Sequence, residues 1–182
     1  VPTPSIEEQH EIYEARKILE IGIARKLAAR HAFIDTDRLL DHVRTERKAI
    51  RANDRGSLFR LSAEFHFLIA ELSGNKQLFD MLRGLLTRSS LHFSLFAPKR
   101  LHNCAGPHEH EDIASAILAG DVEKAATLML DHLVGLETML SMREEPAGFT
   151  SLEEVFADMR IAAAAKGARP AKAASLSTRK RG

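Results

Sequence analysis

The sequence has little of what stabilises small secreted domains or builds β-sheets. Its one cysteine, Cys104, excludes an intramolecular disulfide framework and fits a reducing cytoplasm. Tryptophan is absent and aromatic residues make up only 5%, so the core has to be built from leucine, isoleucine, alanine and phenylalanine. Because strands are enriched in β-branched and aromatic residues, this composition favours helices.

Long apolar runs and a recognisable leader segment are also missing. No apolar run approaches the roughly 18 residues that a membrane span needs, which predicts a cytoplasmic protein without a membrane partner. The chain opens with VPTPSIEEQHEIYEAR, where charged residues stand in place of the apolar segment of a signal peptide. It opens without methionine, which is compatible with a fragment of a longer protein.

Positive charge is concentrated at the carboxyl end of the chain. Residues 161–182 hold six basic side chains and no acidic one, whereas residues 1–160 hold 20 basic and 25 acidic residues, a net charge of −5. A domain with a net negative charge is a poor candidate for binding nucleic-acid phosphates by itself. The basic end is interpreted either as a solubilising tail or as a segment that touches DNA phosphates.

Capping residues and apolar spacing predict helices almost throughout. The signals include a Ser5–Glu8 capping box, Thr36 as the cap of the second helix, Asn53 and Gly56 at its end, and Gly74 and Gly120 after later helices. The predicted helices span about 5–31, 36–53, 57–72, 76–96, 108–118, 122–142 and 151–165.

The predicted architecture is all-α, an antiparallel bundle of six to seven helices with short loops. We expect residues 1–145 to form one domain, 146–165 a short C-terminal helix, and 166–182 a basic, disordered tail.

Three of the nine histidines lie on apolar faces of three different predicted helices: His66, His110 and His132. Residues three, four and seven positions apart share a helix face, so all three side chains are expected to point inward. Burying three imidazoles is unfavourable unless each ring nitrogen finds a partner. Two interpretations follow: histidines packed separately against backbone carbonyls, or a shared divalent metal, whose usual nitrogen ligand is neutral imidazole.

Three segments resemble a known family: EIYEARKILE, EFHFLIAELSGN and EHEDIASAILAGDVEKAATLMLDHL. Together they are similar, in order and spacing over roughly residues 8–142, to the FadR-type C-terminal effector domain (FCD) of GntR-family transcription regulators. The resemblance implies a winged helix-turn-helix before Val1 that binds operator DNA as part of a homodimer. It also implies that the helical domain binds a small organic acid, often beside a metal held by one aspartate and three histidines.

The resemblance carries the three histidine ligands onto His66, His110 and His132, the same three that the helix faces select. The aspartate position, four residues before the first histidine, is Ser62, a weak neutral ligand. We therefore expect zinc or nickel on three histidines, with the fourth position open or filled by the effector.

Three other residues are candidates to replace the missing fourth ligand. Glu64 is only two residues from His66 and so lies on a different face, which makes it a poor substitute for the aspartate. His108 and Cys104 precede His110 in the adjoining loop and are the other candidates.

Three residues are candidates for binding the acid. The resemblance implies that Arg88 faces the pocket, where a buried arginine suits a carboxylate through two parallel hydrogen bonds; the alternative is a solvated surface arginine. Arg16 is a second candidate of this kind, although Glu20, four residues on, could simply pair with it. Asn75 is either a helix cap or a pocket residue.

The predicted function is effector sensing without enzyme activity, and two alternatives remain open. A helical-bundle di-iron enzyme would need two Glu-x-x-His pairs, and the sequence offers only the one that ends at His10. A ligand-free dimerisation module would merely pack its histidines, so that a chelator would change neither its melting temperature nor its oligomeric state.

Overall fold

The computed structural model describes residues 5–96 and 108–141 of the 182. The chain divides into two compact units, 1–145 and 146–182, and all the described residues belong to the first. Cys104, the predicted helix at 151–165 and the predicted tail at 166–182 lie outside the described residues.

The described residues form six α-helices and one short 3₁₀-helix, with no strand among them, which confirms the all-α prediction. The 3₁₀-helix covers His31–Phe33, where the first helix was predicted to end. The α-helices are α1 (Ile6–Ala29), α2 (Thr36–Arg51), α3 (Arg55–Leu72), α4 (Lys76–Phe96), α5 (Glu109–Leu118) and α6 (Val122–Ser141).

Short polar side chains fix where these helices begin. Ser5 caps α1 as predicted, because its Oγ accepts a hydrogen bond from the Glu8 N–H at 3.0 Å. The cap of α2 is Asp35 and not Thr36, since the Asp35 carboxylate accepts from the Arg38 N–H at 3.2 Å and Thr36 is already helical.

The junction between α2 and α3 also differs from the prediction. Asp54 caps α3 through the Ser57 N–H at 3.2 Å, so Gly56 lies inside the first turn of α3 instead of marking the end of α2. Asn53 adopts a φ of +50° in this junction. Asparagine tolerates the left-handed region better than most residues, which allows a tight turn without glycine.

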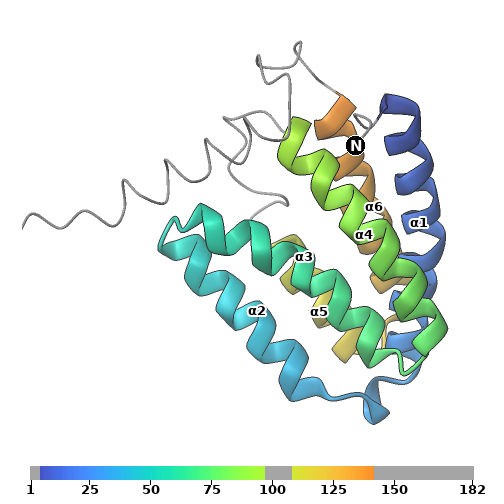
Figure 1. Cartoon of the computed structure of the whole chain (residues 1–182). Helices are drawn as coiled ribbons and strands as arrows, with labels where there is room; N and C mark the ends of the chain where they lie inside the picture. Colours follow the sequence, from blue (N-terminus) through green and yellow to red (C-terminus); the bar gives the residue numbers. More distant parts are fainter. Residues whose placement is uncertain (1–4, 97–107, 142–182) are drawn as a thin grey trace, which may run out of the picture. The chain divides into compact units, whose positions relative to one another are not determined.

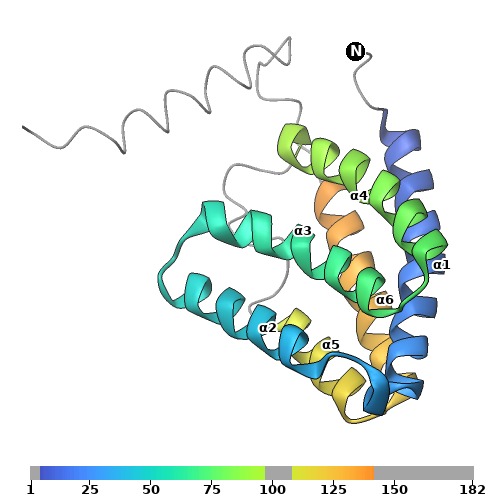
Figure 2. The same cartoon turned by 60° about the horizontal axis from the view of Figure 1, so that its bottom comes forward.

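Helix α1 is the centre of the packing arrangement. It contacts α3, α4, α5 and α6, and α2 packs on α3 and α5. Figure 1 shows α4 and α6 running alongside α1, and Figure 2 shows α2 and α5 lying side by side below α3. None of the described helices has the length and hydropathy that crossing a bilayer requires.

The interior is mainly aliphatic, as the composition predicts. Fully buried side chains come from every α-helix, and they include Ile23, Leu39, Ile69, Ile113 and Leu133. A second group of buried side chains is polar or charged, which is costly unless each finds a partner. Its members include Arg16, Glu20, Glu46, Ser62, His66, Ser89, His110 and His132.

Candidate functional site

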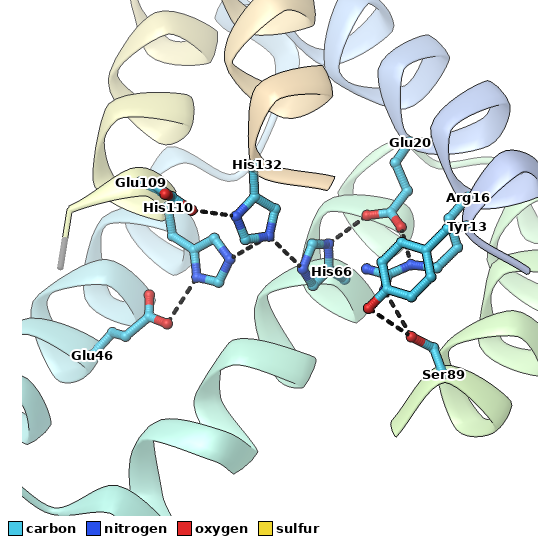
Figure 3. A network of polar contacts seen from close by, with 9 residues as sticks. All are labelled: Tyr13, Arg16, Glu20, Glu46, His66, Ser89, Glu109, His110 and His132. Atoms are coloured by element: carbon cyan, nitrogen blue, oxygen red, sulfur yellow. Dashed lines mark hydrogen bonds and ion pairs between the residues drawn. The ribbon is translucent and has the colours of Figure 1, made fainter. Parts of the chain in front are cut away.

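Three helices bring three buried histidines to one point. His66 comes from the middle of α3, His110 from the first turn of α5 and His132 from α6, and each is at most 3% exposed. The Nε2 atom of His132 lies 3.2 Å from Nε2 of His66 and 3.2 Å from Nε2 of His110 (Figure 3). The structure therefore brings together the three residues that the sequence selects.

Each of these histidines meets a glutamate on the other side of its ring. His110 Nδ1 lies 2.8 Å from Glu46 Oε1, and His132 Nδ1 lies 2.7 Å from Glu109 Oε2. His66 Nδ1 makes the corresponding short hydrogen bond to Glu20 Oε2 (Figure 3).

These three hydrogen bonds determine which ring nitrogen carries the proton. An ionised carboxylate only accepts hydrogen bonds, so a neutral imidazole that faces one through Nδ1 donates from that nitrogen and presents its lone pair at Nε2. Three lone pairs then converge on one point, an arrangement that a cation satisfies. Metal-binding histidines are commonly oriented in this way, by a carboxylate or carbonyl at the nitrogen that does not bind the metal. The donor set therefore fits a divalent metal.

Burial keeps two of these histidines in the neutral form that binds metal. It lowers the pKa of His66 to about 3 and that of His110 well below the usual range, because the charged imidazolium is poorly solvated in the interior. Burial would raise the pKa of Glu20, but the charges and hydrogen bonds of Arg16 and His66 together outweigh it and the pKa falls to about 2. At neutral pH, Glu20 is therefore ionised beside a neutral His66.

An aromatic ring fixes the orientation of His110. Phe65 is fully buried, and its ring stacks on the His110 ring with centroids 4.1 Å apart and an interplanar angle of 13°. This stacking holds His110 from one face while Glu46 holds its Nδ1 edge.

A small pocket opens beside His66. It has a volume of about 40 Å³ and is lined by Tyr13, Arg16, Phe59, Ser62, Ala63, His66, Leu86, Ser89, Ser90 and Leu136. One water occupies about 10–15 Å³ of such a cavity volume, so the pocket has room for roughly three waters or a short-chain acid. Ser62, one helical turn before His66, lies on its wall as a buried residue.

Arg16 supplies a buried positive charge at this pocket. Its Nε donates to Glu20 Oε1 at 2.7 Å, its Nη1 donates to Ser89 Oγ at 2.9 Å, and its guanidinium lies 5.0 Å from the centre of the Tyr13 ring. The two interpretations of Arg16 are therefore compatible, because the side chain pairs with Glu20 and lines the pocket as well.

The structure does not bring Arg88 to this pocket. The Arg88 side chain is 59% exposed and forms an ion pair with Glu8 of α1, in which its Nε donates to Glu8 Oε1 at 3.1 Å. Its neighbour Ser89 lines the pocket instead, because adjacent residues on a helix point in different directions.

The remaining candidates lie outside the pocket. Asn75 caps α4: its Oδ1 accepts hydrogen bonds from the N–H groups of Gln77 and Leu78 at 3.0 and 3.3 Å. His108 is exposed and lies 3.6 Å from Glu111, and Glu64 forms an ion pair with Arg60 at 2.7 Å.

The sequence analysis missed the glutamates that orient the histidines. Glu20 carried a usable signal, since it stands four residues after Arg16 and next to a buried helix face. Glu109 directly precedes His110 but bonds to His132, and Glu46 lies in a run of charged residues on another helix. Only the packing of the helices reveals these two pairings.

Comparison with known proteins agrees with the resemblance. The family model of the FCD domain matches residues 11–135. The HTH-type transcriptional regulator LutR of Bacillus subtilis (strain 168) is 33% identical over 146 residues, which cover 74% of this chain. The chain spans 63% of the length of that relative. The chain belongs to the FCD family, the effector-binding type of domain found in GntR-type regulators.

Proposed function

We propose that the domain senses a short-chain carboxylic acid bound between Arg16 and a divalent metal held by His66, His110 and His132. The observation that supports this most strongly is the convergence of the three Nε2 atoms while a carboxylate holds each Nδ1. Histidines that merely filled space in a core would have no reason to share this orientation.

Zinc or nickel would suit the donor set. Three neutral imidazoles leave the charge of a divalent ion uncompensated among its direct ligands, and zinc commonly combines three protein ligands with one open position. When bound, the metal supplies a Lewis-acidic position for a carboxylate oxygen. Ser62 lines the pocket in place of the aspartate that the resemblance implies, so the fourth position is left to the acid.

The pocket has the charge and size for a small organic acid. Arg16 is 3% exposed, and a buried guanidinium interacts with an anion far more strongly than one in water. Tyr13, Ser62, Ser89 and Ser90, whose side chains carry hydroxyl groups, are among the residues that line this cavity of about 40 Å³. These properties favour short-chain acids over long or aromatic ones.

The acid would act on a DNA-binding domain through α1. This helix carries Arg16 at the pocket and begins at Ile6, and the resemblance implies a winged helix-turn-helix on its N-terminal side, before Val1. An acid that binds two arrangements of α1 with different affinity shifts their populations. We propose that a longer, cytoplasmic protein containing this domain binds operator DNA as a homodimer.

Titration of the zinc-loaded protein with straight-chain monocarboxylates, followed by calorimetry, tests acid binding. Arg16→Gln should raise the Kd by a factor of about 10–100, the effect of losing a hydrogen-bonded charge. Arg88→Gln is the matched control on α4, and we expect less than a twofold change because that arginine pairs with Glu8. Equal losses in the two variants, or no binding at millimolar acid, would contradict the proposal.

A further inference from the structure

One buried carboxylate joins the pocket to the histidine cluster. Glu20 Oε1 accepts a hydrogen bond from Arg16 Nε at 2.7 Å, while Glu20 Oε2 accepts one from His66 Nδ1 (Figure 3). Glu20 is 0% exposed, so water does not screen either interaction. Its two oxygens are thus divided between a pocket residue and a candidate metal ligand.

The other two glutamates of the cluster are placed differently. Glu46 on α2 holds His110, and Glu109 on α5 holds His132. None of the three glutamates lines the pocket, but Glu20 bonds to Arg16, which does. The Glu109 side chain is 44% exposed, in contrast with the enclosed Glu20. His66 itself lines the pocket, and Glu20 connects it through hydrogen bonds to a second pocket residue, Arg16.

We propose that Glu20 is a positioning residue that couples acid binding at Arg16 to metal binding at His66, so that each ligand raises the affinity for the other. This inference rests on the proposed function. It adds the way in which the two sites of that function communicate.

The coupling follows from competition for one carboxylate. An acid that pairs with Arg16 draws the guanidinium away from Glu20, which leaves more of the Glu20 charge for the N–H of His66. A stronger acceptor at Nδ1 makes Nε2 of the same ring a better electron donor and hence a better metal ligand. Coupling between two binding equilibria is reciprocal. A metal bound at His66 Nε2 therefore raises the affinity of Arg16 for the acid by the same factor.

Direct contact between the acid and the metal would also couple the two ligands, and would do so without Glu20. The two explanations differ in what a change at Glu20 does. Coupling by direct contact survives Glu20→Gln, whereas coupling through the shared carboxylate does not. Glu109→Gln is the matched control, because it removes the same charge from a histidine of the cluster but leaves the Arg16–Glu20–His66 connection intact.

The experiment measures zinc affinity by competition with a chelating dye, with and without saturating acetate. In the wild-type protein, acetate should raise zinc affinity about 5–100-fold, the usual range for coupled sites. Glu20→Gln should bind zinc about 10–100-fold more weakly, as loss of a supporting carboxylate does, and acetate should then change its affinity less than about twofold. Glu109→Gln should also weaken zinc binding, but acetate should raise its zinc affinity by the same factor as in the wild-type protein.

The possible results separate the two proposals. If acetate raised the zinc affinity of Glu20→Gln by the same factor as in the wild-type protein, the role of Glu20 would be overturned while the sensor proposal stayed intact. Loss of the factor in both variants would also overturn it, since the effect would then belong to any charge near the cluster. Failure of the wild-type protein to bind zinc would overturn the proposed function and this inference with it.

Circular dichroism and the melting temperature will show whether Glu20→Gln folds. If it does not, Arg16→Gln serves as the test variant instead. It leaves the Glu20–His66 hydrogen bond in place and removes the competitor for the Glu20 charge, so Arg16→Gln should bind zinc more tightly than the wild-type protein when no acetate is present, whereas coupling by direct contact predicts no such gain. NMR of ¹⁵N-labelled zinc protein gives a second readout: acetate should shift the Nδ1 resonance of His66 and leave that of His132 nearly unchanged. Equal shifts of both resonances would contradict a route through Glu20.

Discussion

At the scale of single residues, we propose that Ser62 determines how a metal and an acid would share the site. It lines the pocket one turn before His66 and contributes no charge. Ser62→Asp should raise zinc affinity at least about tenfold, because a carboxylate is a far better zinc ligand than a hydroxyl. It should also weaken acid binding, since the new charge repels an anion and takes its coordination position.

Ser62→Asn controls for the size of the introduced side chain, because asparagine matches aspartate in shape but is neutral. Zinc affinity in both variants can be measured by dye competition. Similar zinc affinities for the Asp and Asn variants would show that position 62 does not reach the metal.

Glu46 provides a second test at this scale. It is 8% exposed and lies 2.8 Å from His110 Nδ1, so Glu46→Gln should keep the packing but weaken the acceptor that orients the ring. We expect zinc affinity to fall about 10–100-fold in dye competition. Glu64→Gln, at a glutamate paired with Arg60 on the surface, should leave zinc affinity unchanged. Equal affinities for the wild-type protein and Glu46→Gln would contradict the orienting role.

The candidate site was only partly predictable at this scale. His66, His110 and His132 are identifiable because helical periodicity fixes which side of a helix is buried. The pairings of Glu46 and Glu109 depend on which helices meet, which periodicity does not determine. Arg88 shows the same limit: the resemblance suggested a pocket residue, but the position of α4 turns that side chain toward Glu8 and brings Ser89 to the pocket.

At the scale of helices, Glu137 of α6 forms ion pairs with two residues of α1. It accepts hydrogen bonds from Lys17 Nζ at 2.8 Å and His10 Nδ1 at 2.7 Å. Partial burial would raise the pKa of Glu137, but these two partners outweigh it and the pKa falls below its ordinary value of 4.5. The folded state therefore binds fewer protons than the unfolded chain, and the stabilisation present above pH 4.5 disappears as the pH falls toward the lowered pKa.

Glu137→Gln should accordingly lower the free energy of unfolding by about 1 kcal/mol at pH 7. This difference should shrink as the pH falls from about 4.5 toward the lowered pKa of the folded state, where the wild-type carboxyl loses its charge. Urea unfolding of the two proteins at a series of pH values measures it. Glu123→Gln, which removes an exposed partner of Arg25 on the same two helices, should have a smaller effect. A difference that does not change with pH would contradict this account.

Helix boundaries were predictable where capping side chains act locally. Ser5 and Gly120 behave as their sequence context indicates. The α2–α3 junction was harder, because Asp35, Thr36, Asp54 and Gly56 all suit a helix start or end. The two aspartates cap α2 and α3, and Asn53, which was predicted at the end of α2, adopts the left-handed conformation there.

At the scale of the whole molecule, a metal that binds only the folded chain should raise its stability. Free metal at 100 times its Kd contributes about 2.7 kcal/mol. For a domain of this size, a chelator should then lower the melting temperature by about 5–10 °C. Differential scanning fluorimetry with and without chelator tests this, with His110→Ala as the control that should not respond. No shift in the wild-type protein would favour the ligand-free dimerisation module.

The metal content of the purified protein shows most directly whether His66, His110 and His132 hold a metal. The chain should be purified without a polyhistidine tag and analysed for transition elements alongside His110→Ala. We predict about one zinc or nickel ion per wild-type chain and a large loss in the variant, because three protein ligands define the site. Equal, substoichiometric metal in both proteins would contradict the account.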